Sequence, residues 1–111
     1  DARDIEGGKA VAVRVDGVDA KAMRQMVDDL RNRLGAGVVM LVAESNGKVL
    51  LAIGVTKELS ASYRAGDLVR ETAEVVGGKG GGRPDFAQAG GKDTSKIPAA
   101  IEKFYQLLGG V

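Results

Sequence analysis

The sequence predicts an α/β domain, or a closely related α+β domain, in which three helices pack on one mixed β-sheet. Three observations lead to this prediction. Short apolar runs bounded by glycine or polar residues are typical of strands, three longer stretches repeat apolar residues at helical spacing, and the two kinds of segment follow one another in the order β-α-β-β-α-(β)-α. A chain of 111 residues fits one domain with one core.

The first strand and the first helix are predicted by different periodicities. Alternating valines indicate a strand over residues 10–15. Asp19 is a suitable N-cap for a helix over residues 20–34, and Gly35 is suited to end it. The apolar residues of this helix lie on one face, and we interpret its two methionines as core residues: Met23, Met26, Val27, Leu30 and Leu34.

A β-hairpin is expected next. Residues 38–43 are continuously apolar, which is typical of a central strand covered on both faces. Asn46-Gly47 then favours a type I′ turn, because both residues tolerate positive φ. Residues 49–55 should therefore pair antiparallel with the central strand, and Gly54 indicates a bulge or a close backbone approach.

A polar segment over residues 56–64 shows no period and is predicted to be a loop. Tyr63 beside Arg64 offers two planar groups on which a nucleobase can stack. A half-buried tyrosine with a solvated hydroxyl agrees better with the general behaviour of this residue, so Tyr63 stays outside the predicted site.

Two further helices enclose a glycine-rich segment. Apolar residues at helical spacing predict one helix over residues 65–76 and another from residue 97 to Gly109-Gly110. Residues 77–91 between them contain seven glycines, and we expect a shaped loop with a short edge strand at 85–89. Residues 1–8 are expected to be a frayed remnant of an upstream connection, and residues 9–111 to form the single domain.

Composition restricts the function. The chain has 16 cationic and 15 anionic residues and a net charge of +1, so any nucleic-acid contact requires a local patch. Histidine and cysteine are absent, which disfavours catalysis and metal binding. We predict no catalytic residue, no metal, no cofactor and no membrane partner, since no apolar run reaches the roughly 18 residues of a spanning helix. A cytoplasmic location is expected.

The glycine-rich segment fits neither of two common nucleotide motifs. A Walker loop requires Lys-Ser or Lys-Thr after the last glycine, and the dinucleotide fingerprint is interrupted by Arg83 or Asp85. Backbone N–H groups of consecutive glycines can instead form an anion-binding nest, assisted by nearby cations. The candidate nucleic-acid-binding residues are Lys79, Gly80, Gly81, Gly82, Arg83, Gln88 and Lys92. In the alternative interpretation, the glycines are needed only because they permit left-handed φ values and close packing, and Arg83 pairs with Asp85 or with a helix carbonyl.

The run GGKGGGRPD over residues 77–85, followed by AQAGG over 87–91, resembles the closing motif of the DHHA1 domain in bacterial alanyl-tRNA synthetases. The similarity continues at residues 26–30, 54–57 and 65–68, so it covers nearly the whole chain. Related domains in DHH phosphoesterases typically carry histidine after the glycine run. Arg83 at that position favours the synthetase branch.

The resemblance implies a tRNA-binding module that contacts the tRNA elbow and helps to couple aminoacylation with editing. The implied partners are tRNA(Ala) and the other domains of the same synthetase, whose catalytic and editing sites lie elsewhere. Two alternatives stay open: a docking module within or between synthetase subunits with a purely structural glycine loop, and a more general nucleic-acid (DNA) binding domain. The oligomeric state is not predicted.

Overall fold

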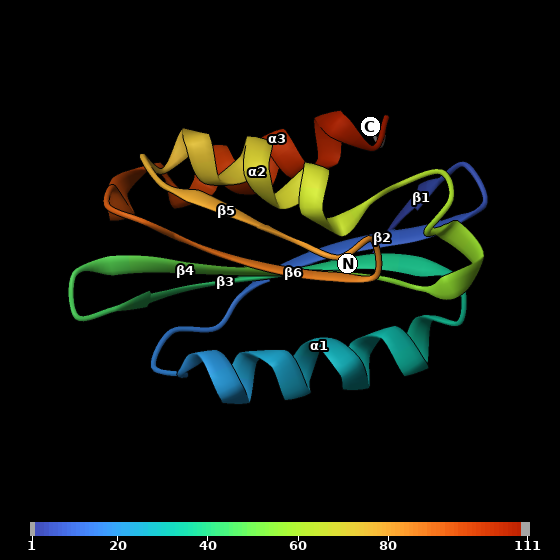
Figure 1. The fold of residues 1–111 in the computed structure, drawn as a ribbon, viewed down its shortest axis with the longest axis horizontal. Helices are drawn as coiled ribbons and strands as arrows, with labels where there is room; N and C mark the ends of the chain where they lie inside the picture. The colour runs from blue at the N-terminus through green and yellow to red at the C-terminus, as the bar shows by residue number, and fades with distance from the viewer. Residues whose placement is uncertain (1, 110–111) are drawn as a thin grey trace.

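The computed structural model describes residues 2–109 as one β-sheet between two layers of helices (Figure 1). The strands are β1 (Arg3–Ile5), β2 (Gly8–Arg14), β3 (Gly37–Ser45), β4 (Lys48–Val55), β5 (Lys79–Gly82) and β6 (Phe86–Gly91). The helices are α1 (Ala20–Leu34), α2 (Ala65–Val75) and α3 (Ile97–Leu107), with short 3-10 turns η1 (Lys57–Leu59) and η2 (Thr94–Lys96). Helix α1 covers one face of the sheet and α2 and α3 cover the other, which confirms the predicted mixed sheet with three helices.

The sheet order is β1-β2-β3-β4-β6-β5. Strand β3 pairs parallel with β2 and antiparallel with β4, and its residues 37–43 are buried, so the predicted central strand is confirmed. The β3–β4 turn has φ of 53° at Asn46 and 77° at Gly47, as a type I′ turn requires. The β3–β4 and β4–β6 registers run through Gly54 without interruption, and a Cβ built there would collide with the Val27 side chain. Gly54 therefore permits a close approach of α1 and is not a bulge.

Helix α1 begins and ends where its caps predict. The Asp19 carboxylate accepts a hydrogen bond from the Ala22 N–H at 2.8 Å, and Gly35 follows the last turn with φ of 76°. Met23 and Val27 are buried against the sheet, which confirms them as core residues.

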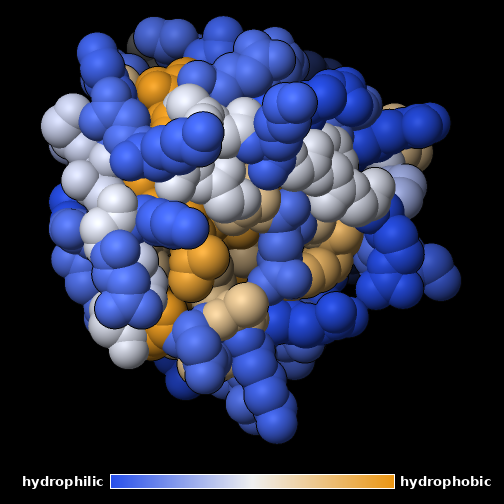
Figure 2. Space-filling model, turned by 60° about the vertical axis from the view of Figure 1, so that its left-hand side comes forward, coloured by the Kyte–Doolittle hydropathy of each residue, from blue (hydrophilic) through white to orange (hydrophobic). Residues whose placement is uncertain are grey.

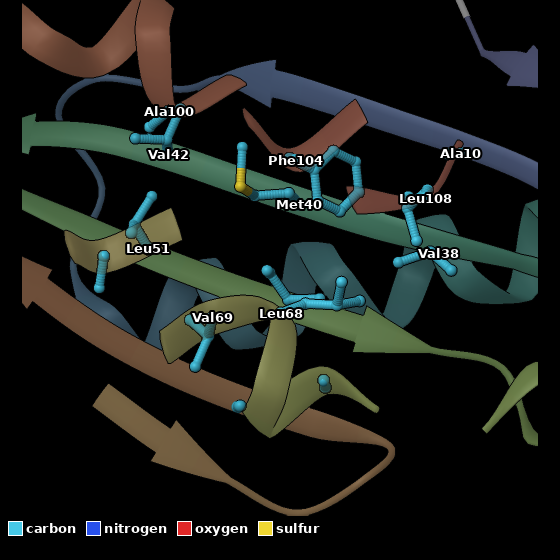
Figure 3. Close-up of a cluster of buried hydrophobic side chains, with 14 of the residues drawn as sticks. Ala10, Val38, Met40, Val42, Leu51, Leu68, Val69, Ala100, Phe104 and Leu108 are labelled. Atoms are coloured by element: carbon cyan, nitrogen blue, oxygen red, sulfur yellow. The ribbon is translucent and has the colours of Figure 1, made fainter. Parts of the chain in front are cut away.

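The larger core lies between the sheet and helices α2 and α3. Met40, Val42 and Leu51 project from the sheet into this core, where Met40 lies beside Phe104 of α3 and Val42 beside Ala100, and Met40, Val42, Leu51 and Phe104 are fully buried (Figure 3). The hydroxyl of Tyr105 accepts a hydrogen bond from the Ala12 N–H at 2.9 Å, so α3 is also tied to the backbone of β2.

The beginning of the chain differs from the prediction for residues 1–8. Arg3–Ile5 form β1, which pairs antiparallel with β2, and Gly7 supplies a φ of 89° in the connecting turn. Backbone pairing orders this segment although its side chains carry no periodic signal. Asp1 and the predicted helix end at Gly110 lie outside the described residues.

The connection after β4 also has more structure than expected. Residues 56–64 include the turn η1, and Tyr63 packs partly buried against the larger core, in agreement with the structural interpretation of this residue. Within residues 2–109, no helix is both long and apolar enough to cross a membrane.

Candidate functional site

The glycine-rich segment is a β-hairpin. The short strand predicted at residues 85–89 is present as β6, but it lies between β4 and β5 and not at the sheet edge, and the preceding glycines form β5 and not the predicted loop. Strand β5 pairs antiparallel with β6, from Lys79 opposite Gly90 to Gly82 opposite Ala87. In this segment only Gly77 has a positive φ, of 69°. An anion-binding nest needs successive residues in αR-αL or turn conformation, so glycines 80–82, which are extended in β5, do not form the predicted nest.

Gly77 and Gly78 end α2 before the hairpin begins. The Gly78 N–H donates to the Ala73 carbonyl at 2.8 Å and the Gly77 N–H donates to the Glu74 carbonyl at 3.1 Å. These two bonds form a Schellman motif, in which the left-handed residue is usually glycine. The expected stop at Gly77 is thus present, and β5 starts directly after it.

Alternate glycines of the hairpin permit close backbone packing. A Cβ at Gly80 would lie 2.7 Å from the Ala89 Cα and from the Gln88 carbonyl oxygen, and one at Gly82 would lie 2.7 Å from the Ala87 Cα. Gly66 of α2 also requires the absence of a side chain, because its Cβ would lie 2.7 Å from the Gly82 carbonyl oxygen. The packing interpretation accounts for these positions without a ligand.

Gly81 is different from its neighbours. A Cβ added there would meet no atom within 4 Å. Side chains alternate between the two faces of a strand, so Lys79, Gly81 and Arg83 lie on the face away from α2. The Lys79 and Arg83 side chains are exposed at opposite ends of this face, with open space between them.

Gln88 lies opposite Gly81 and is held against α1. Its side-chain amide donates to the Ala20 carbonyl at 3.2 Å. A pocket of about 350 Å³ lies at this junction, with Met23, Leu50, Leu51 and Ala89 among its lining residues and Lys79 and Gln88 as its long polar side chains. Figure 2 shows the molecule turned so that the left-hand side of Figure 1 faces the viewer. On this side, apolar surface lies between hydrophilic side chains.

The remaining predicted cations do not lie together. The Arg83 Nε lies 3.6 Å from the Asp85 carboxylate at the hairpin turn, as the structural interpretation expected. Lys92 follows the last residue of β6, at the other end of the hairpin, where its backbone N–H donates to the Val76 carbonyl at 2.8 Å. The structure therefore groups Lys79, Gly81 and Gln88, and it separates Arg83 from Lys92 by the length of β6.

Helix α1 contributes two arginines that sequence reasoning did not include. The Arg24 guanidinium lies 4.7 Å from the centre of the buried Phe86 ring. Arg31 donates to the Asp85 carbonyl at 2.8 Å and also pairs with Asp28, beside an open polar cleft of about 910 Å³ between α1, η1 and the hairpin turn. No sequence signal connects Arg24 with Phe86, because the two residues come together only when α1 crosses the sheet.

Comparisons with known proteins agree on one family. The DHHA1 domain model matches residues 7–110. The chain is 53% identical over 106 residues to the alanine–tRNA ligase of Anaeromyxobacter dehalogenans and 49% identical over 111 residues to that of Myxococcus xanthus. These matches cover 96% and 99% of the chain, respectively, but only 12% of either relative.

A solved structure has the same fold over the whole domain. The C-Ala domain of alanyl-tRNA synthetase from Aquifex aeolicus is 32% identical, with a TM-score of 0.91 and 99% of each chain covered. The predicted resemblance is confirmed. The chain belongs to the DHHA1 domain family, in the form represented by the C-Ala domain of alanyl-tRNA synthetase.

Proposed function

We propose that this domain binds tRNA as a C-terminal module of an alanyl-tRNA synthetase and has no aminoacylation or editing activity of its own. The observation that carries the proposal is the full-length match to the C-Ala domain, together with exposed cations on the face of β5 away from α2. In this role the domain contacts the elbow of tRNA(Ala) and helps to bring the aminoacylation and editing sites of the synthetase to the same tRNA.

The proposed contact depends mainly on shape and phosphate. The outer surface of folded RNA offers backbone more readily than base edges, and lysine and arginine bind that backbone with strong salt dependence. Lys79 and Arg83 are exposed, and their side chains are long enough to reach phosphate oxygens. The Arg83–Asp85 separation of 3.6 Å is long for an ion pair, so this guanidinium can exchange its partner at low cost.

A salt titration of tRNA(Ala) binding to the 111-residue chain, followed by fluorescence anisotropy, tests the proposal. If Lys79 and Arg83 each contact one phosphate, Lys79→Ala and Arg83→Ala should each weaken binding and reduce the slope of log K against log salt by about one. Arg70→Ala is a matched control, since Arg70 lies on α2 beside Asp67 and its side chain is 60% exposed, compared with 67% for Arg83. Absence of salt-dependent tRNA binding by the wild-type chain would contradict the proposal.

A docking role is the second candidate. It is favoured by the packing function of Gly80 and Gly82, which explains two of the motif glycines without any RNA. In that case the chain should bind the remainder of the synthetase, and tRNA affinity should be the same with and without the domain. The same titration on intact and domain-deleted synthetase separates the two functions.

A further inference from the structure

The surface between α1 and the β5–β6 hairpin combines exposed cations with an uncovered strand. We call it the seam and define it by Ala20, Arg24, Lys79, Gly81, Arg83 and Gln88. Helix α1 packs mainly on β3 and β4, so it leaves the adjacent face of β5 open. One end of the seam, at Ala20, Lys79 and Gln88, lines the pocket of about 350 Å³ between α1 and the hairpin.

Arg24 is the cation of the seam that lies over an aromatic ring. The central carbon of its guanidinium lies over the ring of Phe86, 4.7 Å from the ring centre, and the residue is exposed. The ion pairs within residues 2–109 include neither Arg24 nor Lys79, whereas Arg31 is engaged with Asp28 and with the Asp85 carbonyl. An arginine already held on an aromatic ring loses little conformational freedom when it binds a phosphate.

The free edge of β5 adds backbone donors between the two hairpin cations. The Arg83 N–H donates to the Phe86 carbonyl at 3.0 Å, which identifies these two residues as a hydrogen-bonded pair. Bonded and non-bonded pairs alternate in an antiparallel ladder, so the N–H groups of Gly80 and Gly82 point away from β6. Gly66 of α2 lies against the Gly82 end of this edge, where a Cβ on Gly66 would be 3.3 Å from the Gly82 nitrogen, so the Gly80 N–H is the donor that the edge offers to a phosphate.

We propose that the seam is the tRNA-binding surface of the domain, with Arg24 as the principal phosphate contact and Lys79 and Arg83 at either end of the β5 edge. This inference rests on the proposed tRNA-binding function and specifies where it resides. The sugar-phosphate backbone lies along β5, where Gly81 leaves room for it. A short strand with lysine and arginine at its ends is a poor template for strand addition, which favours RNA over an extended polypeptide.

The decisive variants change Arg24. We expect Arg24→Ala to weaken tRNA(Ala) binding to the 111-residue chain and to reduce the salt slope by about one, and combination with Lys79→Ala and Arg83→Ala to reduce it by about three. Arg24→Lys should restore the slope but only part of the affinity, because lysine keeps the charge and loses the contact of the guanidinium with the Phe86 ring. Arg70→Ala serves again as the control, and circular dichroism checks that each variant is folded.

Three results would overturn the inference. If the wild-type chain binds tRNA(Ala) and the triple variant binds it with the same affinity and slope, tRNA binding stands and the seam is not its site. If the amide signals of Gly80 and Gly82 shift in NMR spectra on addition of poly-L-glutamate but not of tRNA(Ala), the edge binds acidic polypeptide instead. A wild-type chain that binds no tRNA would contradict both the seam and the proposed function.

Discussion

The hairpin glycines allow a paired test of the packing argument. Gly80→Ala would place a methyl group 2.7 Å from the Ala89 Cα and the Gln88 carbonyl oxygen, where only backbone movement relieves the overlap. Overpacking of this kind costs about 1–3 kcal/mol, and we expect the upper end because the obstructing atoms include backbone. Gly81→Ala meets no atom within 4 Å, and Gly81 is not among the glycines of positive φ. It should stabilise the domain by about 0.5 kcal/mol through the unfolded state.

The two variants should therefore differ by about 3–4 kcal/mol in free energy of unfolding. For a domain of this size, about 4 °C in Tm corresponds to 1 kcal/mol, so Gly80→Ala should lower Tm by about 12 °C and Gly81→Ala should raise it by about 2 °C. Thermal and urea unfolding followed by circular dichroism measure these differences in stability. Unchanged m-values would show that each variant exposes the same amount of surface on unfolding, so that the free energies can be compared directly. Equal stability of the two variants would refute the packing explanation of the hairpin.

Two further predictions concern the β2 side of the sheet. Tyr105→Phe should destabilise the domain by about 1 kcal/mol in urea unfolding, because the Ala12 N–H loses its acceptor while the ring is retained; an unchanged midpoint would mean that water replaces the hydroxyl. Hydrogen bonds from the Arg14 side chain and from the Glu44 backbone N–H hold the pKa of Asp16 below its ordinary value of 3.8. Since the folded-state pKa is depressed, Asp16→Asn should lower Tm at pH 7, and the difference from wild type should disappear as the pH falls below 3.8 through the folded-state pKa. A difference that persists in acid would contradict the assignment.

Elements with local signals could be predicted to within one or two residues. Helix α1 carries its own N-cap at Asp19 and its own stop at Gly35, and the β3–β4 turn is encoded by Asn46-Gly47. These residues act on their immediate neighbours, so no knowledge of tertiary contacts is needed to place them.

Elements without local signals were mispredicted or missed. The glycines of β5 have no side chains, so neither periodicity nor β-propensity is visible, and the strand exists because β6 pairs with it. Likewise β1 is too short and polar to show alternation, and it forms through pairing with β2. In the candidate site, Lys79 and Arg83 were predicted as candidate binding residues from the motif, whereas Arg24 could not be predicted because it meets Phe86 only when α1 packs across the sheet.

The sheet order has a consequence for how the domain completes folding during synthesis. Strand β6 is inserted between β4 and β5, so β4 has no partner on one side until residues 86–91 have been made. Until then β4 offers the apolar edge VLLAIGV, the kind of segment that promotes intermolecular pairing. Pairing of β6 in the glycine hairpin with β4 therefore covers this aggregation-prone edge late in synthesis. Chains that end before Phe86 should associate with one another rather than fold.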